Sequence, residues 1–237
     1  GFGGIPIQRV SAAEAGPLLD AVLSAGINYI DTARGYTVSE ELIGQAIEGR
    51  RDQFVLATKS MARDREAMEA DIQTSLANLR TDHIDLYQVH NPTVAQLEQV
   101  CAPGGALEAL REAQGAGKIG HLGVTAHSLE VFERALELDW VETVMFPYNI
   151  VETQGEALIK KAQAKNIGFI AMKPLAGGAF EDAALALRFI AANDAVTVLI
   201  PGRYDPKEVA QNKAAVEDAA SLSLEELSRM EQVRQAL

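Results

Sequence analysis

The sequence has little of what several classes of protein require. Its 237 residues include one cysteine, Cys101, so there is no intrachain disulfide and no metal site built from several thiolates. No apolar run reaches the ~18 residues of a membrane-spanning helix, and no signal peptide is recognisable. Basic residues are also few: 21 Lys and Arg face 33 Asp and Glu, a formal net charge of −12. Because nucleic acids and anionic membranes bind basic patches, we expect neither as a partner and predict a cytoplasmic protein.

The rest of the composition is ordinary for a soluble globular protein, with 48% apolar and 23% charged residues. The length suits one large α/β domain or two small ones. No linker or low-complexity tract is visible, so residues 1–237 are expected to form a single domain. The chain opens on glycine rather than methionine, so we expect the native start to be missing, and a missing C-terminal extension stays open.

Apolar strand-like runs alternate with amphipathic helical stretches along the whole chain. After a first strand in the opening residues, strands are predicted at 28–33, 54–59, 83–90, 121–126, 141–149, 168–175 and 196–202. Between and after them, helices are predicted at 11–25, from 39, around 68–79, and at 105–116, 129–138, 153–165, 181–193, 206–218 and 224–236. The longest predicted loop is 91–105. Eight strand–helix units in this length favour a closed (β/α)8 TIM barrel over an open doubly wound sheet.

Four ionisable side chains are predicted at the rim where such barrels form active sites, the C-terminal ends of the strands. Asp31 lies near the end of the second predicted strand, and Lys59 and His90 end the third and fourth. Tyr36 lies in the loop after the second strand. A lysine that ends a buried strand needs a counter-charge, which Asp31 can supply. On these residues alone, a structural ion pair and a packing tyrosine stay open as the alternative.

The remaining residue patterns narrow the chemistry. The sequence lacks the His-x-His of many metal-dependent hydrolases, the G-x-S-x-G of serine hydrolases and a carboxylate pair for glycoside hydrolysis. With these three kinds of hydrolase site excluded, the chemistry that the rim residues still support is proton transfer by Tyr36. An ammonium favours the phenolate, so Lys59 is expected to lower the tyrosine pKa from its usual ~10 and make Tyr36 a general acid. His90 is expected to orient a substrate oxygen. A hydride for carbonyl reduction then has to come from a cofactor.

The second half of the chain predicts where that cofactor binds. Barrel phosphate sites commonly use the loops after strands seven and eight, which here are 174–180 and 201–212. The first loop has glycines that allow close backbone approach. The second has Arg203 and Lys207 beside a helix start, where free amides favour an anion. A turn followed by an exposed helix is the alternative interpretation.

With these residues in view, the chain resembles the aldo-keto reductase family over essentially its whole length. The matching stretches, in order, are NYIDTARGYTVSEELIG, VLATK, SLANLRTDHIDLYQVHNP, KIGHLGVTAHS, PYNI, MKPLAGG and IPGRYDPKEVAQN. By this match, Asp31, Tyr36, Lys59 and His90 take the positions of the family's catalytic tetrad. The resemblance implies NADPH-dependent, metal-free, reversible reduction of a small-molecule aldehyde or ketone, with NAD(H) as the other candidate cofactor.

The resemblance also implies cofactor contacts, some at positions where this chain departs from the family. The replaced positions are Thr125, Ala126, Met145 and Met172 around the nicotinamide, and Gly202 and Glu208 in the 2′-phosphate loop. Arg203 is expected to substitute for the cations missing at these two positions. The full predicted set of cofactor-binding residues is Gly4, Thr125, Ala126, Met145, Met172, Pro174, Leu175, Ala176, Gly177, Gly202, Arg203, Lys207, Gln211 and Asn212.

Two functions stay open on the sequence. The first is a carbonyl reductase, which the complete tetrad favours. The second is a cofactor-binding regulatory or redox-sensor protein with slow turnover, which the altered nicotinamide pocket permits. The stretches GFGGIPIQ and MKPLAGG look most like a bacterial or archaeal branch in which some members carry an iron–sulfur segment after the barrel, and its cysteines are not present here. Neither the substrate nor the oligomeric state follows from the sequence.

Overall fold

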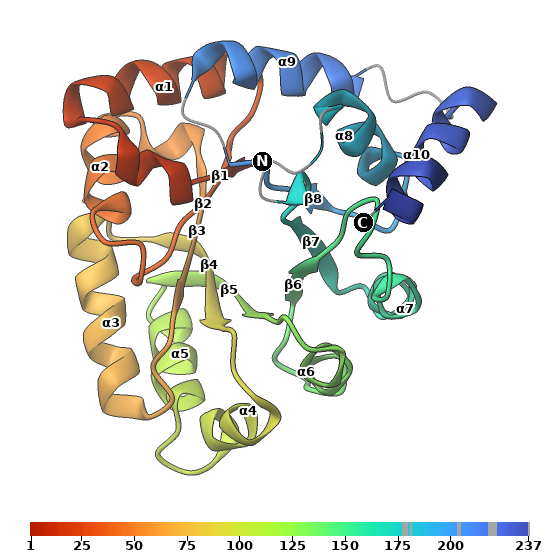
Figure 1. Cartoon of the computed structure of the whole chain (residues 1–237). Helices are drawn as coiled ribbons and strands as arrows, with labels where there is room; N and C mark the ends of the chain where they lie inside the picture. Colours follow the sequence, from red (N-terminus) through yellow and green to blue (C-terminus); the bar gives the residue numbers. More distant parts are fainter. Residues whose placement is uncertain (177–179, 181, 203–204, 218–221, 237) are drawn as a thin grey trace.

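A closed ring of parallel strands surrounded by helices forms the centre of the protein (Figure 1). The computed structural model describes residues 1–176, 180, 182–202, 205–217 and 222–236. Within them, eight strands form one sheet in sequence order, each parallel to the next. Gly3 closes the ring through a bridge to Gly202, and its amide donates to the Pro201 carbonyl at 3.1 Å. The predicted (β/α)8 barrel is confirmed.

Strands and helices alternate along the described part of the chain, as the apolar patterning predicts. The strands are β1 Phe2–Gly3, β2 Tyr29–Asp31, β3 Val55–Ser60, β4 Ile84–His90, β5 Ile119–Thr125, β6 Thr143–Pro147, β7 Gly168–Met172 and β8 Val198–Leu199. The α-helices are α1 Ala12–Ser24, α2 Ser39–Ala46, α3 Arg65–Asn78, α4 Val94–Cys101, α5 Ala106–Gly115, α6 Leu129–Ala135, α7 Glu156–Ala164, α8 Ala183–Ala191, α9 Pro206–Glu217 and α10 Leu224–Ala236, with 3₁₀ turns η1 Ile5–Arg9 and η2 Arg51–Gln53. None of the described helices has both the length and the apolarity needed to cross a bilayer.

Helix α4 corrects one prediction, because it occupies most of the segment 91–105 that was expected to be a loop. A capping box starts it: the Thr93 hydroxyl accepts from the Gln96 amide at 3.2 Å, and the Gln96 side chain accepts from the Thr93 amide at 3.0 Å. Leu97 and Val100 are fully buried beneath the helix. With only two such residues in eight, its apolar period was too short to recognise in the sequence.

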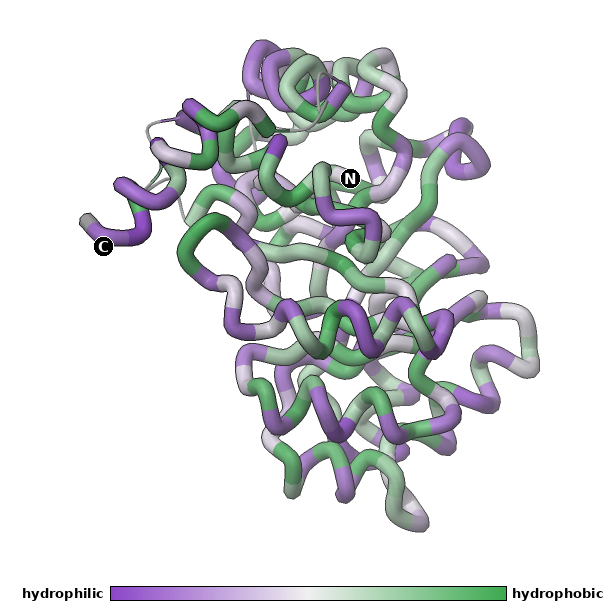
Figure 2. The backbone as a smooth tube through the Cα atoms, turned by 90° about the vertical axis from the view of Figure 1, so that its right-hand side faces the viewer, coloured by the Kyte–Doolittle hydropathy of each residue, from purple (hydrophilic) through white to green (hydrophobic). Residues whose placement is uncertain are grey.

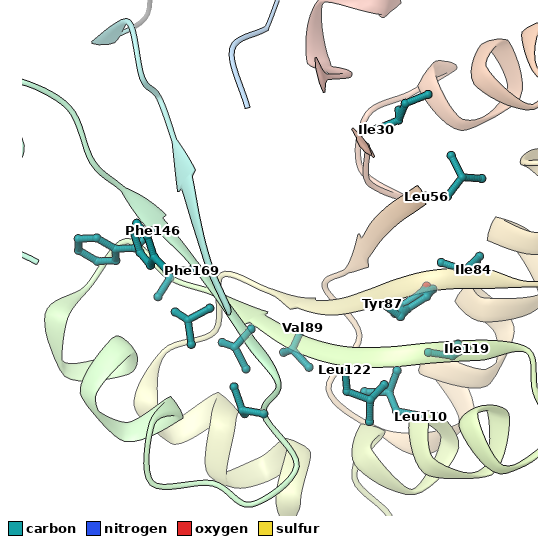
Figure 3. Close-up of a cluster of buried hydrophobic side chains, with 14 of the residues drawn as sticks. Ile30, Leu56, Ile84, Tyr87, Val89, Leu110, Ile119, Leu122, Phe146 and Phe169 are labelled. Carbon is teal, nitrogen blue, oxygen red and sulfur yellow. The ribbon is translucent and has the colours of Figure 1, made fainter. Parts of the chain in front are cut away.

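The main core lies between the outer face of the barrel and the helices. Apolar and polar segments alternate along the chain that surrounds the barrel (Figure 2), and strand residues that point outward meet the apolar helix faces. Figure 3 shows Leu122 of β5 beside Leu110 of α5, both fully buried or nearly so. Burial of one such side chain contributes about 1.5–3 kcal/mol, so this layer supplies most of the stability of the barrel.

A smaller apolar group fills the inside of the barrel and supports the polar rim above it. Its buried members are Ala57, Leu86, Met145, Ile170 and Ile200. Because residues two apart on a strand point to the same side, Lys59 follows Ala57, and Gln88 and His90 follow Leu86, on the inner face. The interior therefore changes from apolar to polar toward the C-terminal ends of the strands.

The last two helices, α9 and α10, follow β8. Helix α9 packs beside α1, next to the seam where β8 meets β1 (Figure 1). Helix α10 starts with the predicted capping box: the Glu226 side chain accepts from the Ser223 amide at 2.8 Å, and the Ser223 hydroxyl accepts from the Glu226 amide at 3.2 Å. Its Met230 is buried against Leu185 and neighbouring apolar residues.

Candidate active site

A cavity of about 660 Å³ opens at the C-terminal ends of the strands. Asp31, Tyr36, Lys59 and His90 all line it, so the barrel brings together the four residues that the sequence placed at this rim. The other walls come from the turn after β1 and from the loops after β5, β7 and β8.

Asp31 and Lys59 form a buried ion pair at the base of the cavity, which confirms the expected counter-charge. Lys59 Nζ donates to Asp31 Oδ2 at 2.6 Å and to the Thr32 carbonyl at 2.7 Å. The Lys59 side chain is 1% exposed and the Asp31 side chain is 4% exposed. Burial raises the pKa of Asp31 and lowers the pKa of Lys59, while their mutual contact acts against both shifts. Each charge thus compensates for the hydration that the other has lost.

Tyr36 lies over this pair in the loop between β2 and α2. Lys59 Nζ is 5.0 Å from the centre of the Tyr36 ring, and the ring meets His90 edge to face with centroids 6.1 Å apart. Burial and the Asp31 carboxylate raise the pKa of Tyr36 above its usual value. The expectation of a lowered Tyr36 pKa is therefore wrong for this state, because burial, together with the Asp31 charge, disfavours the phenolate. The phenol is neutral near pH 7 and holds the proton that a general acid donates.

A buried carboxylate outside the barrel holds the Tyr36 loop in place. Glu40 is 1% exposed and accepts hydrogen bonds from Arg34 at 2.7 Å, Thr58 at 2.7 Å and Ser75 at 2.8 Å. Arg34 precedes Tyr36 by two residues, and Thr58 precedes Lys59. One side chain therefore connects the loop to β3. This contact was not predicted from the sequence, because only the fold places Glu40 between the loop and the strand.

His90 lies at the end of β4 as a neutral imidazole. Burial and the charges of Lys59, His127 and Arg63 lower its pKa to about 4. A neutral imidazole has one N–H donor and one acceptor nitrogen, and Nδ1 is buried without a hydrogen-bond partner among the described residues. His90 can therefore hydrogen-bond a substrate oxygen without bringing a charge to the cavity.

The structure places only part of the predicted cofactor set at this cavity. The residues that line it are Gly4, Thr125, Met145, Met172, Pro174, Leu175 and Gly202. Ala126 is fully buried, and its amide donates to the Met145 carbonyl. Ala176 does not line the cavity either. On α9, Lys207 and Gln211 are exposed and Asn212 is buried, away from the lining. Gly177 and Arg203 lie outside the described residues.

Four further ionisable side chains line the cavity that the predicted cofactor-binding set did not contain: Arg9, His127, Lys173 and Glu208. Arg9 follows β1, His127 follows β5 and Lys173 follows β7. His127 Nδ1 lies 3.0 Å from Asn91 Oδ1. Lys173 has a left-handed backbone with φ 53°, and its carbonyl accepts from the Asn149 amide at 3.0 Å. The places of Arg9, His127 and Lys173 in the segments that follow strand ends were the available signal. Arg9 and Lys173 bring positive charge to the cavity, whereas burial lowers the pKa of His127 and disfavours its charged form.

The lining suits a dinucleotide with an apolar ring at one end and phosphates at the other. Met145, Met172 and Ile200 form an apolar floor beside the tetrad. The Thr125 hydroxyl accepts from the Asn91 amide at 2.9 Å, which leaves its own proton free to donate to a ligand. The exposed cations Lys173, after β7, and Arg9, after β1, can face phosphate. Among the described residues, no three metal-ligating side chains converge.

Comparisons with known proteins give one family. The model of the Aldo/keto reductase family matches residues 1–184. Among curated proteins, the Bacillus subtilis aldo-keto reductase YhdN is 36% identical over 151 residues, 57% of this chain and 44% of that protein. The uncharacterized oxidoreductase YqkF of the same organism is 28% identical over 176 residues, 68% of this chain and 56% of that protein. The chain thus spans only about half the length of these two relatives.

Solved structures match over a larger share of both chains. The holo form of the Bacillus halodurans aldo-keto reductase AKR11C1 has a TM-score of 0.86 at 25% identity, covering 100% of this chain and 92% of that one. A Klebsiella pneumoniae aldo-keto reductase in complex with NADPH has a TM-score of 0.85 at 26% identity, covering 99% and 90%. The similarity therefore extends beyond the residues that the family model matches.

Proposed function

This chain belongs to the aldo/keto reductase family, and we propose that it reduces an aldehyde or ketone to the alcohol, reversibly, with NADPH. The observation that carries this proposal is the cavity in which Tyr36 and His90 face each other above the buried Asp31–Lys59 pair. A similar solved protein was captured with NADPH. The two curated relatives are named as an aldo-keto reductase and an uncharacterized oxidoreductase, which favours an enzyme over the regulatory alternative.

The cofactor contacts are part of the proposal. NADPH, when bound, supplies the hydride that no side chain can. The apolar floor with Met145 and Met172 would hold the nicotinamide, and the Thr125 hydroxyl would hydrogen-bond its amide. Lys173 and Arg9 would face the phosphates. Arg203 is proposed as the main contact of the 2′-phosphate and hence as the source of a preference for NADPH over NADH, because arginine can bind phosphate through two charged hydrogen bonds.

The protein's own part is to place and protonate the carbonyl. His90 hydrogen-bonds the carbonyl oxygen and orients it, and the Tyr36 hydroxyl gives that oxygen its proton. The raised pKa keeps the phenol protonated until the transfer. As negative charge develops on Tyr36, the Lys59 ammonium lies 5.0 Å from the ring centre and stabilises it. Asp31 keeps that ammonium charged and in place.

Steady-state oxidation of NADPH with a panel of aldehydes, ketones and quinones tests the activity. Tyr36→Phe should lower turnover at least ~100-fold while NADPH affinity stays the same, since general acid catalysis contributes on that scale. Tyr29→Phe is the matched control: it also removes one buried hydroxyl from the barrel interior, but outside the cavity lining. The proposal fails if none of the carbonyl compounds in the panel supports NADPH oxidation by the wild type. It also fails if Tyr36→Phe keeps near-normal turnover.

A further inference from the structure

Gln88 has a fully buried side-chain amide inside the barrel. It lies two residues before His90 on β4, so the two side chains point to the same side of the strand. It lies on the inner face of β4, opposite Lys59 in the sheet register, and is 0% exposed. Neither its Oε1 nor its Nε2 has a hydrogen-bond partner among the described residues. An unpaired buried amide destabilises a folded chain, and an apolar side chain such as that of Leu86, two residues earlier, would pack there without this cost. Its presence therefore points to a purpose other than packing.

The nearby Asp31 carboxylate has the complementary need. Lys59 occupies Oδ2, while Oδ1 is buried and has no hydrogen-bond partner among the described residues. The Gln88 amide lies close enough to lower the pKa of Asp31, although no hydrogen bond of good geometry joins the two side chains. An amide NH₂ donates and a carboxylate oxygen accepts. Because the oxygen and nitrogen of an amide occupy similar volumes, Gln88 can turn its NH₂ toward Asp31 without repacking.

The neighbouring strands leave room for this amide. At Gly123 of β5, a Cβ atom would lie 3.2 Å from Gln88 Cγ and 2.2 Å from Thr143 Oγ1, so only glycine fits. The Thr143 hydroxyl is also buried and unpaired within the described structure. It can donate to Gln88 Oε1, which would direct the NH₂ of Gln88 toward Asp31.

We propose that Gln88 is a positioning residue of this active site: its NH₂ donates a hydrogen bond to Asp31 Oδ1 and keeps the Asp31–Lys59 pair charged beneath Tyr36. The physical reason is that burial favours transfer of the proton from lysine to aspartate, and a donor to the carboxylate opposes that transfer. The inference rests on the proposed reductase function. Four other titratable groups lie near the pair: Tyr29 and Tyr36 near Asp31, and Glu40 and His90 near Lys59.

Gln88→Met tests the proposal, because methionine keeps the length and volume of glutamine but cannot donate. Without the donor, Asp31 binds a proton more readily, so the acid limb of the kcat profile should move up by about one pH unit. We expect kcat near neutral pH to fall about tenfold, on the scale of one charge-assisted hydrogen bond, with NADPH affinity unchanged. A side chain that only filled space would leave the acid limb where it is.

Leu86→Met is the matched control, a similar change on the same face of β4 among apolar neighbours. It should leave both kcat and the acid limb near those of the wild type. An unshifted acid limb in Gln88→Met, or an equal shift in Leu86→Met, overturns the proposal.

A crystal structure of the wild type with NADPH gives a test that does not depend on turnover or on folding of the variant. The proposal requires Gln88 Nε2 within about 3.2 Å of Asp31 Oδ1, and a longer separation refutes it. If the wild type reduces no carbonyl, the reductase proposal fails, and this distance still decides the placement of Gln88.

Discussion

Asp31→Asn should expose how strongly the buried ion pair is coupled. Asparagine keeps the volume and an oxygen that can accept from Lys59 Nζ, so the 2.6 Å hydrogen bond can persist while the counter-charge is lost. Lys59 is then an uncompensated ammonium at 1% exposure. Breaking a buried pair in this way costs about 3–5 kcal/mol. We therefore expect the free energy of unfolding near pH 7 to fall by about 3 kcal/mol or more.

The size of this loss should depend on pH in a definite direction. Burial already lowers the pKa of Lys59, and removal of Asp31 lowers it further. The folded variant then releases a proton that the unfolded chain keeps up to its ordinary lysine pKa of about 10.4. Because the unfolded state binds more protons, the stability of the variant rises with pH through this range. The difference in free energy of unfolding between the wild type and Asp31→Asn should therefore become smaller from about pH 6 to about pH 9.

Urea denaturation followed by circular dichroism at several pH values measures this difference in free energy of unfolding. The double variant Asp31→Asn/Lys59→Met removes both charges and should recover about 2 kcal/mol or more relative to Asp31→Asn. Turnover should fall to a similar level in Asp31→Asn, in Lys59→Met and in the double variant, because the two residues act as one unit. A loss below about 1 kcal/mol, a difference that does not change with pH, or a double variant less stable than Asp31→Asn would refute the reasoning.

Three further predictions follow from other parts of the site. Glu40→Ala removes the acceptor of Arg34, Thr58 and Ser75 but leaves Asp71 at 3.6 Å from the partly exposed Arg34. It should lower the free energy of unfolding by about 2–3 kcal/mol in the same urea titration, and a loss within experimental error would show that Glu40 does not hold the loop. His90 has a folded pKa of about 4, below the unfolded ~6.5, so the protein should lose stability as pH falls through this window. His90→Gln should flatten that loss, and unchanged thermal melts across the window would contradict it. Arg203→Ala should weaken NADPH binding ten- to a hundred-fold, about 1.5–3 kcal/mol, and barely change NADH binding. Equal losses for both cofactors in a fluorescence titration would remove Arg203 from the 2′-phosphate site.

Much of the fold was predictable because local patterns carry it. The alternation of apolar strands with amphipathic helices determined a parallel sheet covered by helices, and the number of units determined a closed barrel. The capping box at Ser223 marked the start of α10 from sequence alone. Helix α4 could not be recognised in the same way, since its two fully buried residues have no periodic pattern around them and only packing reveals its inner face.

The sequence by itself determined which residues reach the active rim, because every strand of a parallel barrel ends at the same side. Asp31, Lys59 and His90 therefore came together as soon as the strand ends were located. Only the tertiary structure decided their electrostatics. The direction of the Tyr36 pKa depends on how far burial and the Asp31 charge outweigh the Lys59 ammonium, and sequence spacing contains neither burial nor distance. For the same reason Glu40 and Gln88 became visible only in the structure: each acts on the pair through contacts between elements that are remote along the chain.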